Sequence, residues 1–150
     1  MASRRQCREW VVQLLFILDM NKQELKQLFE DFWSDRESDS NARKFTEHHV
    51  TDIVGRISEL DEILRQYSHN WGLHRIGVIE RNVIRMSIYE ILFRDDIPSV
   101  VSINEAVDIA KYFGNNESGS FVNGILDNLR KSTDGSGTGK IERNAKEKRD

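Results

Sequence analysis

The sequence is poor in cysteine and in proline. Of its 150 residues, one is a cysteine, Cys7, and one is a proline, Pro98. A single cysteine excludes an internal disulfide and a zinc site built from several cysteines, and it suits a reducing compartment. The scarcity of proline leaves long stretches that helices can occupy without interruption, so we expect helices to dominate.

Long apolar runs and secretion signals are also missing. No run approaches the roughly 20 residues that a membrane span needs. The first residues, MASRRQCREW, pass from arginines straight into a mixed segment without the cleavage pattern of a signal peptide. We therefore expect a cytoplasmic protein without membrane association. A hydrophobic content of 38% is enough for one globular domain with a core.

An excess of positive charge is absent as well. The net charge of −3 argues against a strongly basic nucleic-acid binder. Positive charge is nevertheless concentrated locally, because residues 1–18 carry three arginines against one glutamate. Residues 74–94 and 130–150 are the other segments with a positive balance. A polyanionic ligand would therefore have to bind one of these three segments.

Motifs for catalysis or cofactor binding are not recognisable. The glycines of residues 135–139 lie in a polar tail, without the lysine and serine of a phosphate-binding loop and without a dinucleotide-binding context. His48 and His49 are adjacent, so a helix would point them about 100° apart, and no third ligand has a suitable spacing. We expect no metal, no cofactor and no enzymatic activity.

Apolar residues recur at helical spacing along most of the chain, which predicts an all-α protein of about six or seven helices. The segment 76–93 is apolar over so wide a surface that we expect it to be a central helix, touched by several others. Ser102 and Glu105 resemble a capping box at a helix start, and Gly114 resembles a left-handed stop at that helix's end. The expected helices cover about 4–20, 22–33, 42–67, 76–93, 102–112 and 121–131.

The last of these helices contains an unusual glycine. In FVNGILDNL the apolar residues recur every fourth position, so the Asn123-Gly124 pair belongs to a helix rather than to a hairpin turn. We expect Gly124 to allow a close backbone contact with the preceding helix across a short turn, NNESGS. Residues 132–150 contain one large aliphatic side chain, so we expect a disordered polar tail after a domain of residues 1–131.

Several motifs occur together in an order that resembles one protein family. They are the start SRRQCREWVVQLLF, the run VIERNVIRMSIYEILFRDDIP, and the run SINEAVDIAKYFGNNESGSFVNGILDNL. Each motif alone is weak, but their order and spacing over residues 3–129 are similar to those of the NusB family of bacterial transcription antitermination factors.

The resemblance implies a small helical protein in two antiparallel bundles. It implies binding to the boxA element of ribosomal-RNA leader transcripts, together with the small-subunit ribosomal protein NusE, in an antitermination complex with RNA polymerase. The free protein is expected to be a monomer or a weak homodimer. The implied partner contacts are Glu80 and Tyr89. The implied RNA-binding residues are Arg4, Arg5, Arg8, Phe16, Phe113, Asn115, Asn116, Glu117, Ser118 and Phe121.

The residue types leave some alternatives open. From the apolar pattern alone, Phe16 and Phe121 are more often core residues than rings on which RNA bases stack. Three arginines near a terminus, in contrast, have little role in a core. The chain could instead serve as an RNA-binding module for a separate ribosomal-RNA methyltransferase. It could also be a helical adaptor for proteins alone, whose arginines are merely solvated.

Overall fold

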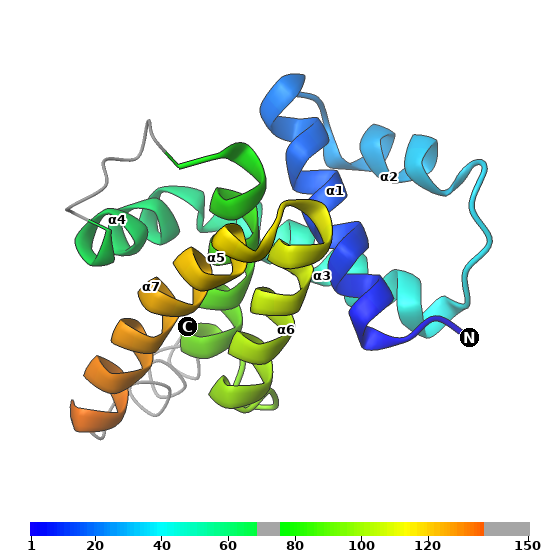
Figure 1. The fold of residues 1–150 in the computed structure, drawn as a ribbon. Coiled ribbons are helices and arrows are strands. Elements are labelled where there is room, and N and C mark those ends of the chain that lie inside the picture. The colour runs from blue at the N-terminus through cyan, green and yellow to red at the C-terminus, as the bar shows by residue number, and fades with distance from the viewer. Residues whose placement is uncertain (69–75, 137–150) are drawn as a thin grey trace, which may run out of the picture. The chain divides into compact units, whose positions relative to one another are not determined.

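A computed structural model describes residues 1–68 and 76–136 of the chain (Figure 1). Within these ranges the chain forms seven helices and no strand, which confirms the predicted all-α class. None of these helices has the length and apolar character that a membrane span requires. The helices are α1 (Arg4–Met20), α2 (Leu25–Trp33), α3 (Ser40–Gly55), α4 (Ile57–Tyr67), α5 (Val78–Phe93), α6 (Ser99–Phe113) and α7 (Asn116–Ser136).

The first three helices form one compact unit, Met1–Arg56. α1 packs against α3, and Trp10 of α1 meets Trp33 of α2 edge to face, with ring centroids 5.2 Å apart. Asp39 closes the unit, since its carboxylate accepts hydrogen bonds from the backbone N–H groups of Ala2 and Ala42. The bond from Ala2 is the main reason that the pKa of Asp39 is lowered. Asp39 thereby caps α3 and ties down the chain start.

The remaining helices form the second unit, Ile57–Asp150, and α5 is its centre. α5 contacts α4, α6 and α7, which confirms the central helix expected from its wide apolar surface. Every residue from Asn82 to Leu92 is buried. α6 and α7 run side by side in opposite directions (Figure 1).

Because Asn82–Leu92 of α5 are buried, the polar side chains among them need partners within the protein, and neighbouring helices supply two of these. Arg85 makes a two-pronged ion pair with Asp61 of α4, with N···O distances of 2.6 and 2.8 Å. The hydroxyls of Ser87 and of Ser102 in α6 lie 2.8 Å apart. Such pairs offset the cost of removing polar groups from water.

The helix boundaries expected around Arg56 and Ser102 were wrong. The helix expected over 42–67 is divided into α3 and α4, because Arg56 leaves helical geometry, with φ −118° and ψ 15°. The expected capping box is also absent, since α6 begins three residues earlier and Ser102 is a buried residue in its interior. The Ser102 side chain pairs with Ser87 across the helix contact instead of capping a helix.

The connection between α6 and α7 is shorter than expected and consists of Gly114 and Asn115. The expected turn residues 116–120 lie in the first turns of α7. Gly114 has a φ of −112°, so it is not a left-handed stop; a methyl group there would lie 2.5 Å from Ser118 Oγ. α7 continues to Ser136, so residues 132–136 of the expected tail are helical, and the rest of that tail lies outside the described residues.

The packing role expected for Gly124 was wrong. Gly124 is exposed, and a methyl group on it would have no neighbour within 4 Å. A glycine of α7 that does lie under a side chain of α6 is Gly119, where a methyl group would come within 2.6 Å of Lys111 Cγ. The close approach of α6 and α7 is therefore one and a half turns nearer to the connection than the sequence suggested.

Replacing Gly124 should stabilise the protein. Gly124→Ala should raise the free energy of unfolding by up to about 1 kcal/mol, because alanine has the higher helix propensity and the added methyl group meets no atom. Gly119→Ala is the matched control, and it should gain less because it must displace the Lys111 stem. Denaturant unfolding measures both, and a lower midpoint for Gly124→Ala would contradict the prediction.

Candidate nucleic-acid interface

The start of α7 holds four of the predicted RNA-binding residues. Asn115 caps the helix, since its Oδ1 accepts a hydrogen bond of 2.9 Å from the backbone N–H of Ser118. Asn115, Asn116 and Glu117 are exposed, whereas Ser118 is buried. The amide and carboxyl groups of the three exposed residues can therefore reach a ligand, while Ser118 faces inward.

Ser118 connects this turn to α5. Its hydroxyl donates a hydrogen bond of 2.9 Å to Glu80 Oε1, between residues 38 positions apart. Glu80 lies in the first turn of α5, and its carboxylate covers Gly77, where any side chain would collide with it. Glu80, expected as a partner contact, therefore lies directly against a residue that was expected to bind RNA.

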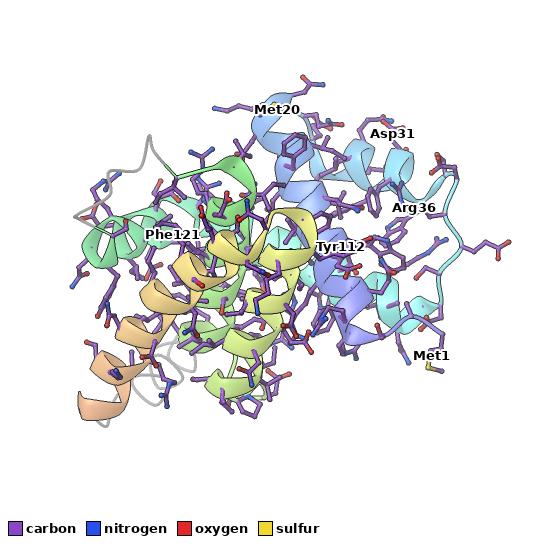
Figure 2. All side chains as sticks on the ribbon, viewed as in Figure 1. Met1, Met20, Asp31, Arg36, Tyr112 and Phe121 are labelled. Carbon is purple, nitrogen blue, oxygen red and sulfur yellow. The ribbon has the colours of Figure 1, made fainter. Side chains whose placement is uncertain are left out.

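A cavity of about 280 Å³ lies between the starts of α5 and α7. Phe121 (labelled in Figure 2) is half-buried in the wall of this cavity. It is therefore neither a fully buried core residue nor a fully exposed ring on which an RNA base could stack. The residues that line this cavity are Ile76, Gly77, Glu80, Asn115, Glu117, Ser118 and Phe121. They combine one aromatic face with carboxylate and amide groups, which suits the face and the edge of an unpaired base.

The end of α6, just before its connection to α7, carries two further aromatic side chains. Phe113 is half-buried, and Tyr112 beside it is 71% exposed. Their ring centroids lie 5.1 Å apart in an edge-to-face arrangement. Tyr112 was not among the predicted site residues, since a tyrosine at a helix end carries no signal in the apolar pattern. The exposure of its ring in the structure is the only feature that marks Tyr112 as a candidate.

The predicted arginines lie on α1 in the first unit. Arg4 is exposed and Arg5 is half-buried. The guanidinium of Arg4 lies 4.4 Å from the ring centre of Phe45, and that of Arg8 lies 5.5 Å from it. Arg8 is only 4% exposed, so the expectation that these arginines have little role in a core was wrong for Arg8. Cation–π contacts with Phe45 hold both side chains against α3.

Phe16 lies farther along α1 and is 38% exposed. The apolar pattern favoured a core position for it, and the structure leaves its ring open to solvent. Twelve residues separate it from Arg4, which corresponds to roughly 18 Å along the helix. The first unit therefore presents positive charge at one end of α1 and an open aromatic ring near the other.

Tyr89 does not lie where a partner protein could contact it. It is 1% exposed, and its ring stacks on that of Phe93, with centroids 6.5 Å apart. The pKa of the neighbouring Arg94 is raised, chiefly by its hydrogen bond to Asp96 and to a smaller extent by its hydrogen bond to Tyr89. Tyr89 is therefore corrected from a partner contact to a packing residue of α5.

Comparisons with known proteins agree with the motifs. The model of the NusB family matches residues 5–131. The chain belongs to the NusB family. The matched range of this NusB family member includes every candidate site residue except Arg4.

Individual relatives of this NusB family member support the assignment. The transcription antitermination protein NusB of Myxococcus xanthus is 42% identical, over 86% of this chain and 95% of that protein. The structure of T. maritima NusB is 37% identical, covers 87% of this chain and 92% of that one, and superimposes with a TM-score of 0.79. A chain from the crystal structure of a plectonemic RNA supercoil is 25% identical, covers 88% and 96%, and has a TM-score of 0.80.

The hydrogen bond between Ser118 and Glu80 should contribute to stability. Ser118→Ala should lower the free energy of unfolding by about 1 to 3 kcal/mol, because it leaves a partly buried carboxylate without this donor. Ser120→Ala is the matched control on the same helix, at an exposed position. Chemical unfolding of both variants tests this, and equal midpoints would show that the bond contributes nothing.

Proposed function

We propose that the chain is a transcription antitermination factor that binds boxA-type single-stranded RNA of ribosomal-RNA leader transcripts. In this proposal it acts together with a NusE-type ribosomal protein in an RNA polymerase complex, and it acts by binding, without catalysis. Membership of the NusB family and the name of the Myxococcus xanthus relative support the role in antitermination. The observation that carries RNA binding is the α6–α7 connection, where exposed amide and carboxyl groups adjoin aromatic rings.

Each group of residues has a chemical role in the proposal. Arg4 and Arg5 neutralise phosphates and release counterions, which gives affinity without sequence preference. Phe16, Phe113 and Phe121 offer ring faces to unpaired bases, and the side chains of residues 115–117 reach base edges that a duplex would hide. Ser118 and Arg8 keep structural roles, since each is buried and holds a neighbouring group in place.

The proposed partner site is the start of α5, around Glu80. The half-buried carboxylate of Glu80 has one oxygen bonded to Ser118, and its negative charge suits a basic segment of a partner. Because Glu80 also supports the α7 turn, RNA and partner would bind to neighbouring parts of the same unit.

Loss of the two outer arginines should weaken RNA binding uniformly. With Arg4→Ala and Arg5→Ala combined, affinity for boxA RNA and for unrelated single strands should fall alike, and the slope of log K against log salt should flatten by about one to two. Lys22→Ala with Lys26→Ala, two exposed lysines of the same unit, is the charge-matched control. A salt titration measures the slopes. The same slope in wild type and the arginine variant would rule out this role.

Glu80→Gln separates the charge of Glu80 from its support of α7. The amide oxygen can still accept the bond from Ser118, so binding of boxA RNA by the protein alone should stay near wild type. Affinity for the NusE-type partner should fall, most clearly at low salt. Calorimetry with each ligand tests this prediction. Unchanged partner affinity would remove Glu80 from the proposed interface.

A further inference from the structure

Tyr112 is the most exposed aromatic residue in the described part of the chain. It lies in the last turn of α6 and is 71% exposed, whereas Phe16, the next aromatic in order of exposure, is 38% exposed. Its side chain stands at the end of α6 in Figure 2. Burial of a large ring is ordinarily favourable, so a ring held this far out of the core contributes little to folding.

The ring of Tyr112 is nevertheless held in position. The edge-to-face contact with Phe113, at 5.1 Å and an interplanar angle of 69°, restricts its rotation. Phe113 is itself half-buried and therefore fixed by the unit beneath it. With most of its surface in solvent, Tyr112 presents an open aromatic face at a defined place.

Lys111 precedes Tyr112 in α6 and carries a positive charge, on a side of the helix about 100° away from the ring. The stem of Lys111 crosses the buried Gly119 of α7, where an added methyl group would lie 2.6 Å from Lys111 Cγ and 2.9 Å from Lys111 Cε. This packing carries the Lys111 ammonium towards α7. The end of α6 thus offers an aromatic face and a cation, and the exposed amide groups of Asn115 and Asn116 follow Tyr112 by three and four residues.

We propose that Tyr112 is a stacking platform for one unpaired base of a single-stranded RNA, and that Lys111 binds an adjacent phosphate. A base has an aromatic face and an anionic backbone beside it, which matches this pair of side chains. The exposed residues that follow Tyr112 in the chain, 115–117, are all polar, which suits RNA better than the apolar centre of a protein interface. This inference rests on the proposed RNA-binding function and adds Lys111 and Tyr112, in the last turn of α6, to the surface that already includes Phe113.

Stacking makes a specific prediction for two variants of Tyr112. Tyr112→Ala should weaken binding of boxA single-stranded RNA by about 5- to 150-fold, whereas Tyr112→Phe keeps the ring and should bind near wild type. Val101→Ala, at a 41% exposed position of the same helix, is the matched control and should not change affinity. Lys111→Ala should flatten the salt slope by about one.

RNAs that carry one abasic nucleotide at each position in turn complete the test. At one position the missing base and Tyr112→Ala should not be additive, because both remove the same stacked pair. If the losses of affinity were additive at every position, or if Tyr112→Phe lost as much affinity as Tyr112→Ala, base stacking on Tyr112 would be ruled out. Absence of RNA binding by the wild-type protein would instead overturn the proposed function. Thermal unfolding of each variant identifies any loss caused by misfolding.

Discussion

The burial of Asn82–Leu92 in α5 is the constraint on which the second unit depends. A helix in that position has no solvent to satisfy its polar side chains, so other protein groups must do so. Each neighbour supplies one partner, which fixes how that helix is placed along and around α5. These pairs are Arg85 with Asp61 of α4, Ser87 with Ser102 of α6, and Glu80 with Ser118 of α7.

The third pair connects the core to the surface. Ser118 is buried, but the residues just before it in the chain are exposed, so the same turn contacts both the core and the solvent. Asn115 holds that turn from the other side through the Ser118 amide. A ligand would therefore meet side chains whose backbone is already ordered, which reduces the entropy lost on binding.

The helices could be predicted from the sequence because periodic burial leaves a periodic pattern. That pattern located α1 and identified α5 as the central helix. It could not locate the break at Arg56, nor the pairing of Glu80 with Ser118, because tertiary contacts set both and the pair is 38 residues apart. Arg8 and Tyr112 were misjudged or missed for the opposite reason. An arginine is expected to be exposed, and a tyrosine at a helix end suggests neither exposure nor burial. Packing decided the exposure of each side chain, burying Arg8 and leaving Tyr112 in solvent.

The two-residue connection between α6 and α7 also bears on the order of folding. Closing so short a loop costs little chain entropy, and the contacts it brings together are close in sequence. The α6–α7 hairpin can therefore form early, whereas the Glu80–Ser118 bond must wait until α5 has docked. The exposed residues of the turn would then gain their support from α5 only after the hairpin itself has formed.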